Sequence, residues 1–378
     1  MAEESRYIFT ITPEQRNALL SPENDLNNSL REAFQPLKDT FDEQGFVLVR
    51  GLLDESLLQR LCNASQTLGG PTQGPALFSS LEFGPVFDTE EKVYRDASIY
   101  SSIPALIARV LLNTKDDENC NDEAPTLRLL KDAFLAKGLE TGSCGWHVDD
   151  NVFWPTDASS DGVNTWLALD DIPKKYGGGL AISPKSHTAE WKKTAYDAIG
   201  STPTLPPEGI TPEKLLKTFG QTCDIANLNK DLHDRIEASK LVFDYKKGDC
   251  LFCKRWLFHR SMPINEEGMA YYNEGTKLKR YTIRYERGDA KLIRGISLEP
   301  SILMNSDNSG RSLDEVCNMD GPYYPQCWPP LDVNANREQE LQMDKLAKDT
   351  LPLAQTKKSQ KIKELMAEAK KDKPTYSA

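Results

Sequence analysis

The chain has 378 residues, of which 39% are hydrophobic and 27% are charged, as is typical of a globular protein with a substantial core. Its 46 Lys and Arg residues and 57 Asp and Glu residues give a net charge of −11, which opposes binding to nucleic acid and to anionic membranes. The longest apolar runs are too short to cross a bilayer. These properties disfavour a nucleic-acid partner and a membrane-spanning protein.

The two ends and the cysteines indicate a cytosolic protein. The first residues, MAEESRYIFT, lack the basic and apolar regions of a secretory signal, and the last three, YSA, are not a peroxisomal Ser-Lys-Leu tail. Eight cysteines are scattered along the chain, so we expect reduced thiols rather than a disulfide framework. Cys250 and Cys253 have redox or zinc spacing, but they lie in the apolar run LFCKRWLF, which favours two core cysteines on a strand.

The first third of the chain predicts helices around one strand. Residues 1–30 are polar and form an expected lead-in with loose attachment. Apolar residues at helical spacing from Ala33 to Phe41 precede the strand-like FVLVRG, and Asp54 begins a second amphipathic helix. The segment YSSIPALIARVLLNT predicts a buried helix.

Between about residues 126 and 288 the pattern changes to short apolar or alternating segments bounded by turn residues. Such a series favours a β-sandwich or barrel over a parallel α/β sheet. The seven candidate strands lie in TLRLLKDAFLAKG, GWHVDD, VNTWLALDDI, GGLAISP, KLVFDYKKGD, CLFCKRWLFHRS and KRYTIRYERG.

Two segments interrupt or follow the predicted strands. An insertion at about 190–238 contains helix-like stretches, and we expect a lid or a side wall there. A Pro/Asn/Asp-rich loop at 299–333 precedes a charged helical tail. The predicted organisation is a polar lead-in at 1–30, one domain at 31–298 that includes the insertion, and a C-terminal loop and charged helical tail at 299–378.

The stretch GWHVDDN contains the first candidate metal ligands. On a strand His147 and Asp149 point to the same face, although a histidine and an aspartate at this spacing also occur by chance in turns. A non-haem iron(II) site needs two histidines and one carboxylate. Of the other histidines, His233 lies in a polar helical segment and His187 follows a turn, whereas His259 ends a largely apolar strand. We therefore predict His259 as the third ligand.

The ordered series of motifs resembles the phytanoyl-CoA dioxygenase family of Fe(II)/2-oxoglutarate oxygenases. The resemblance covers roughly residues 34–290, and it implies a double-stranded β-helix, a cupin-like jelly-roll barrel with flanking helices. The predicted fold is therefore mainly β, which agrees with the series of strands. The segments that carry it are TFDEQGFVLVRGLLDESLLQRL, WHVDD, WLALDDI, GGGLAISPKSH, GDCLFCKRWLFHRS and RYTIR.

The resemblance also implies the roles of single residues. His147, Asp149 and His259 match the family's iron ligands. The family holds the distal carboxylate of 2-oxoglutarate with an arginine on a late strand, helped by a hydroxyl two residues past the second histidine. Arg280 and Ser261 match these positions, and a guanidinium suits a carboxylate because it offers a planar pair of donors.

One departure from the family leaves the anchoring arginine open. The separation from the second histidine to Arg280 is longer than usual, as though INEEGMAYYNEGTK were an inserted loop. Arg284, on the same face of the strand, is the runner-up, and Arg287 lies at the strand's end. Trp166 is a candidate neighbour of the co-substrate, with packing in the core as the favoured interpretation.

The implied reaction oxidises a C–H bond of a small-molecule metabolite, consumes O₂ and 2-oxoglutarate, and releases succinate and CO₂. We expect hydroxylation, since the retained Asp149 disfavours halogenation, while cyclisation and desaturation use the same ligands. Acyl-CoA 2-hydroxylation is a further alternative, but it would suit a peroxisomal tail. A non-catalytic barrel and a zinc hydrolase, which would not need Arg280, are the competing classes. Residues 150–154 are expected near the mouth of the site, and the oligomeric state stays open.

Overall fold

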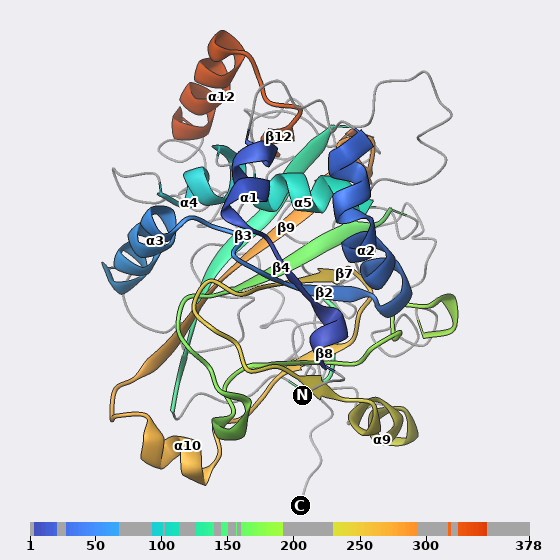
Figure 1. Ribbon diagram of the computed structural model, residues 1–378, viewed down its shortest axis with the longest axis vertical. Helices are drawn as coiled ribbons and strands as arrows, with labels where there is room; N and C mark the ends of the chain where they lie inside the picture. The colour runs from blue at the N-terminus through green and yellow to red at the C-terminus, as the bar shows by residue number, and fades with distance from the viewer. Residues whose placement is uncertain are drawn as a thin grey trace, which may run out of the picture.

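The molecule is built around one large and one small β-sheet that lie against each other (Figure 1). The computed structural model describes residues 4–20, 28–67, 93–100, 103–112, 126–139, 145–149, 156, 160–191, 230–292, 317–318 and 324–345. The expected mouth residues 150–154 and most of the 190–238 insertion lie outside these ranges. Within them, no helix combines the length and the apolar composition required to span a bilayer.

The large sheet has seven strands, and neighbouring strands are antiparallel except for the parallel pair at one edge. In order across the sheet, the strands are β1 (Ile8–Thr10), β2 (Phe46–Arg50), β7 (Cys250–Lys254), β4 (Gly162–Ala168), β9 (Lys277–Arg287), β3 (Leu127–Gly138) and β12 (Gln326–Trp328). The long strands β3, β9 and β4 therefore form its centre.

The small sheet has three strands in the order β6 (Leu241–Val242), β5 (Leu180–Ile182) and β8 (His259–Ser261). A separate short pair is formed by β10 (Lys291–Leu292) and β11 (Cys317–Asn318). Apolar side chains from both sheets pack together, among them Trp166 and Leu251 of the large sheet and Ile182 of the small one. This shared core separates the two sheets.

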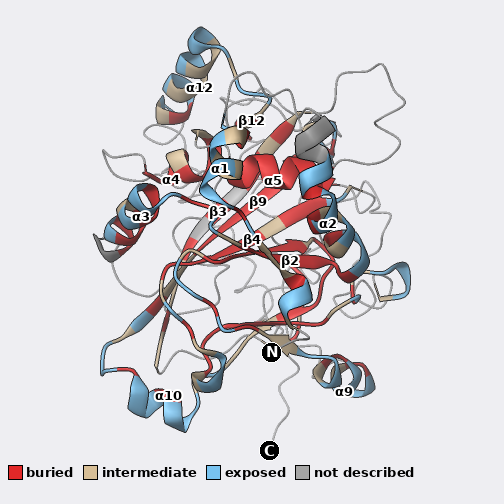
Figure 2. Cartoon of the chain, in the orientation of Figure 1, coloured by how far each residue is buried: buried red, intermediate tan, exposed pale blue. Residues whose placement is uncertain are grey.

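Helices cover the outer face of the large sheet (Figure 1). Every residue of α5 (Ile103–Leu112) is buried, as Figure 2 shows, because it lies between the sheet and α2 (Asn28–Gln44). Beside them lies α3 (Glu55–Thr67), which begins after Asp54, whose carboxylate accepts a hydrogen bond from the Leu57 amide. The remaining helices are η1 (Glu4–Tyr7), α1 (Pro13–Leu19), α4 (Val93–Arg95), a π-helix (Asp96–Tyr100), η5 (Lys174–Tyr176), α9 (Lys230–Ala238), α10 (Glu266–Tyr271) and α12 (Val333–Lys345).

The two faces of the large sheet differ in chemistry because side chains alternate along each strand. On β9, Tyr281, Ile283 and Tyr285 belong to the core beneath the helices. Arg280 and Arg284 therefore lie on the opposite face, the one that faces the small sheet. Residues paired across β9 and β4 share a face, so the partners of this row on β4 face the small sheet as well.

All seven segments predicted as strands contribute to β-pairing, but one of them is divided. CLFCKRWLFHRS forms β7 and then β8, with Arg255 and its neighbours between them, so His259 begins a strand instead of ending one. GWHVDD contributes a single bridge, between His147 and His259. Cys250 and Cys253 are buried free thiols, as expected of core cysteines on a strand. Cys250 packs in the core beneath the helices, and Cys253 packs in the core between the two sheets.

Both flanking regions contribute to the large sheet. Residues 8–10 of the expected lead-in pair with β2, so loose attachment is wrong for this part, because backbone pairing and the buried Tyr7 and Ile11 hold it. Residues 326–328 form β12 where a loop was expected. The first part of the predicted helical tail is confirmed as α12, while residues 346–378 lie outside the described residues. A helix at the end of the insertion is confirmed as α9. The predicted boundaries of the domains remain predictions.

Candidate metal centre

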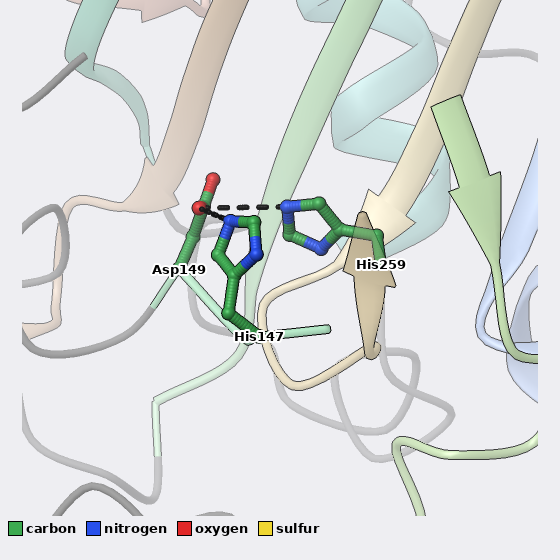
Figure 3. Close-up of side chains that lie close together, drawn as sticks. All are labelled: His147, Asp149 and His259. Atoms are coloured by element: carbon green, nitrogen blue, oxygen red, sulfur yellow. Dashed lines mark ion pairs between the residues drawn. The ribbon is translucent and has the colours of Figure 1, made fainter. Parts of the chain in front are cut away.

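Two histidines and one aspartate lie together at the face of the large sheet that looks toward the small sheet (Figure 3). One ligand atom from each of His147, Asp149 and His259 lies within 4.8 Å of the others. Nε2 of each histidine is 3.5 Å from the same oxygen of Asp149, Oδ1. The three atoms thus surround one point, although the second histidine is more than 100 residues from the first.

Backbone pairing places the two imidazoles side by side. The amide of His147 donates to the carbonyl of His259 at 3.0 Å, and the amide of His259 donates back to the carbonyl of His147 at 3.0 Å. Residues that exchange both hydrogen bonds direct their side chains to the same side of the pair. The ring centroids are consequently 4.5 Å apart.

Each imidazole is held in the tautomer that a metal requires. Nδ1 of His147 is 2.7 Å from the carbonyl oxygen of Gly145, and Nδ1 of His259 is 3.0 Å from that of Leu257. Since a carbonyl oxygen only accepts, each Nδ1 carries the proton. The other nitrogen of each ring, Nε2, then faces Asp149 and is the atom available to a metal ion.

The carboxylate of Asp149 is buried and held by two donors. Its Oδ2 accepts hydrogen bonds from Nδ2 of Asn164 and from Nη2 of Arg284, both at 2.7 Å. Burial acts to raise the pKa of Asp149, but the charge of Arg284 and the two facing histidines outweigh burial and hold the pKa well below its usual value. Asp149 is therefore ionised, as a ligand must be.

The structure distinguishes the three arginines of β9. Arg284 forms a buried ion pair with Asp149. Arg280, four residues earlier on the same face, lies with its guanidinium carbon 5.9 Å from the centre of the Trp166 ring. Arg287 lies at the strand's end, as predicted, where it pairs with Asp289.

The two remaining predicted residues flank the same region. Trp166 is buried in the core between the sheets, with its ring 4.7 Å from that of Tyr245, so the favoured interpretation as a core residue is confirmed. It also lies beneath Arg280. Ser261 is half-buried on β8, two residues after His259, and pairs with Leu180.

The other two histidines lie elsewhere. His187 places Nε2 3.1 Å from the backbone carbonyl of Asp42. His233 lies on α9 beside the exposed Asp234. The structure therefore brings together the pair of histidines that the sequence predicted.

Two contributors to the site were not predicted. Asn164 is a polar residue on the buried strand β4. The sequence signal for it was its position two residues before Trp166, which places both side chains on the same face of the strand.

Glu237 on α9 accepts hydrogen bonds from Nε1 of Trp146 at 2.8 Å and from Nη2 of Arg260 at 3.1 Å. These two partners are the sequence neighbours of His147 and His259, so α9 holds the pair of ligand segments from outside. A glutamate in a polar helix gives no such signal in the sequence.

Comparison with known proteins agrees with this geometry. The family model of phytanoyl-CoA dioxygenase matches residues 41–268, more than half of the chain. No protein with a curated description matches the sequence.

Several solved structures share the fold. The non-haem α-ketoglutarate-dependent epimerase SnoN from nogalamycin biosynthesis is 16% identical with a TM-score of 0.50, over 78% of this chain and 98% of that chain. SnoN in complex with Fe³⁺, α-ketoglutarate and nogalamycin RO is 15% identical with a TM-score of 0.50, over 78% and 99%. The carbocyclase SnoK is 15% identical with a TM-score of 0.49, over 76% and 94%. At such identities the likeness concerns the fold alone, and the likeness to SnoN confirms the predicted fold class of a mainly β protein with flanking helices.

Proposed function

We propose a function from the premise that this chain belongs to the phytanoyl-CoA dioxygenase family and is an iron- and 2-oxoglutarate-dependent oxygenase. In this proposal His147, Asp149 and His259 hold the iron. The observation that carries it is the convergence of their three ligand atoms within 4.8 Å. Two neutral imidazoles and one carboxylate are the donor set of non-haem iron(II) oxygenases, which leave positions open for the co-substrate and O₂.

The residues present fit this metal. The carbonyls of Gly145 and Leu257 hold Nδ1 of each imidazole, so Nε2 is the nitrogen that faces the metal position. The carboxylate is ionised by its environment, so it can bind a cation without first losing a proton. When bound, iron and 2-oxoglutarate activate O₂ for the oxidation of a C–H bond, with succinate and CO₂ as coproducts.

Arg280 is our proposed anchor for the distal carboxylate of 2-oxoglutarate. Its runner-up, Arg284, already donates to Asp149 at 2.7 Å. Arg280 faces the same space from four residues away, over the ring of Trp166. In this proposal its guanidinium binds the carboxylate as a two-pronged donor, Trp166 flanks the co-substrate, and Ser261 contributes a hydroxyl from β8.

We propose hydroxylation of a small-molecule metabolite as the reaction. Hydroxylation requires no group beyond the iron ligands and the co-substrate anchor. SnoN is described as an epimerase, so outcomes such as cyclisation or desaturation remain the second candidate. A cytosolic location and the absence of a nucleic-acid partner also remain proposals, supported by the composition and the net charge of −11.

The test is anaerobic reconstitution with Fe(II) and 2-oxoglutarate, followed by exposure to O₂ in the presence of a library of metabolites. We expect succinate release that depends on one class of metabolite and disappears in His147→Ala. His187→Ala is the matched control, since this histidine lies outside the site, and it should retain turnover. Metal-dependent hydrolysis without succinate would instead support the zinc hydrolase, and a folded, iron-loaded protein that releases no succinate with any metabolite would support the non-catalytic barrel.

A further inference from the structure

The two oxygens of Asp149 have different surroundings. Oδ1 faces the Nε2 atoms of His147 and His259, each at 3.5 Å. Oδ2 points away and accepts two hydrogen bonds at 2.7 Å, from Asn164 and Arg284. One oxygen is therefore presented to the metal position, while the other is already engaged by protein donors.

We propose that Arg284 and Asn164 are positioning residues that restrict Asp149 to binding the metal through a single oxygen. This inference rests on the proposed iron site and adds a constraint on its coordination. A carboxylate can bind a cation through one oxygen or through both. Arg284 and Asn164 remove the second option, because rotating Oδ2 onto the metal would break both hydrogen bonds, one of them to a buried cation.

The constraint matters because open coordination positions are scarce. A metal of this kind takes about six ligands, and two imidazoles with one carboxylate oxygen leave about three positions. A chelating 2-oxoglutarate would need two of them and O₂ would need one. If Asp149 bound through both oxygens, one of these positions would be lost, so holding Oδ2 preserves room for both co-substrates.

The fold makes this arrangement rigid. Asn164 on β4 and Arg284 on β9 are direct cross-strand partners in the middle of the large sheet. Asp149 itself lies outside the regular strands, so these two donors connect it to the sheet. The two histidines are connected instead to the small sheet through the pairing of His147 with β8. The centre is thus held from both sheets, with the aspartate oriented by the large one.

A purely structural role for Arg284 makes a different prediction. The Arg284–Asp149 pair is buried, and replacing either partner leaves an unpaired buried charge that destabilises the fold. A structural role would lower stability without changing how many positions of the bound metal are open. A count of those positions therefore separates the two roles.

The experiment uses Mn(II) alone as the probe, so no turnover is involved. The number of water molecules that exchange on the bound ion is obtained from water-proton relaxation, at Mn(II) concentrations that saturate each protein. We expect about three waters in the wild type, since three protein atoms are ligands. In Arg284→Met and in Asn164→Ala, Oδ2 loses one of its two donors and can turn onto the metal more easily, and we expect the number to fall toward two.

Arg280→Met is the matched control, because it makes the same chemical change on the same face of the same strand without touching Asp149. It should keep the wild-type number of waters. If Arg284→Met fails to fold, Asn164→Ala decides alone, since it removes only one of the two hydrogen bonds and leaves the ion pair.

A wild-type number in Asn164→Ala and in any folded Arg284→Met would overturn the proposal, as would about two waters in the wild type. Failure of the underlying site looks different. In that case His147→Ala would bind Mn(II) as tightly as the wild type does, and no variant near Asp149 would matter.

Discussion

At the scale of single residues, the side chains along one face of β9 make different contacts in and near the proposed site. Arg284 orients a metal ligand through a hydrogen bond of 2.7 Å. Arg280 lies on the same face over Trp166. Glu286, near the end of this strand, is fully buried on the same face, where it accepts a hydrogen bond from the hydroxyl of Thr156. Basic and acidic side chains thus follow one another along a single row.

Arg280→Ala tests whether Arg280 binds the distal carboxylate of 2-oxoglutarate. Losing a charged two-pronged donor costs about 1.5–3 kcal/mol, so we expect the KM for 2-oxoglutarate to rise by roughly 10–100-fold. Affinity for Mn(II) should stay near the wild-type value, because Arg280 touches none of the predicted ligands. A KM that does not change would move the anchor to Arg284.

Glu286 is expected to make stability depend on pH. Burial raises its pKa to about 8, despite the charge of Arg255 and the hydrogen bond from Thr156. The unfolded chain ionises this carboxyl near its usual value of 4.5, so the folded state keeps a proton that the unfolded state has lost. As pH rises from about 4.5 to about 8, this difference lowers the free energy of unfolding by at most ~1.4 kcal/mol per pH unit.

Glu286→Gln should remove that loss. Urea unfolding at several pH values should show the variant gaining stability over the wild type between pH 4.5 and pH 8, with no further gain above it. Asp289→Asn, which removes an exposed carboxyl nearby, serves as the control and should show little change. A constant difference between Glu286→Gln and the wild type across this range would contradict the assigned pKa.

The sequence could predict which three residues the structure brings together as proposed metal ligands, but not the residues that position Asp149. His147 and Asp149 are two residues apart, and few histidines compete with His259. The contacts of Arg284 and Asn164 with Asp149 depend on the register between β4 and β9, which brings residues 120 positions apart to the same point. Register is set by long-range pairing, so the choice between Arg280 and Arg284 stayed open until the structure placed them.

At the scale of elements, alternation predicted the strands while tertiary contacts decided where they break. The segment from Cys250 to Ser261 was expected as one strand because its residues are largely apolar. The chain turns after Lys254, where the buried Arg255 donates to the backbone of Thr156 and Ser160. Those partners lie about 100 positions away, so the local pattern contains no sign of the break.

The contribution of α9 is tested by Glu237→Ala. This side chain holds Trp146 and Arg260, and both bonds are half-exposed, so we expect a loss of about 1 kcal/mol in the free energy of unfolding. Glu190→Ala is the control from the same insertion. Glu190 is exposed and its ion pair with Arg235 is long, at 3.9 Å, so this substitution should change the free energy of unfolding by less than about 0.5 kcal/mol. Equal effects in the two variants would show that α9 does not hold the ligand segments.

At the scale of the whole molecule, one face of the large sheet contains the main apolar core and the other contains the proposed site. The helix-covered face of the large sheet contains a continuous apolar core. The opposite face, toward the small sheet, combines a smaller core with the buried ion pair of Asp149 and Arg284 and the buried carboxyl of Glu286. The fold class could be predicted from the series of strands, whereas β1 and β12 could not, because short edge strands form only where a neighbouring strand offers a partner.

Metal binding should therefore stabilise the whole fold. An ion that binds only the folded state adds about 2.7 kcal/mol when its concentration is 100 times its Kd. We expect Mn(II) to raise the Tm of the wild type and to leave that of His259→Ala unchanged. Differential scanning calorimetry measures the Tm of both proteins. The same rise in both would show that the ion binds elsewhere.

The proposed function depends most directly on the binding of one ferrous ion by three side chains. Anaerobic titration with Fe(II), followed by a chelator competition, measures both stoichiometry and affinity. We expect about one ion per chain in the wild type and the loss of this site in His147→Ala, Asp149→Ala and His259→Ala, with His187→Ala unaffected. A correctly folded wild type that binds no Fe(II), or single variants that bind it as well as the wild type, would contradict the account.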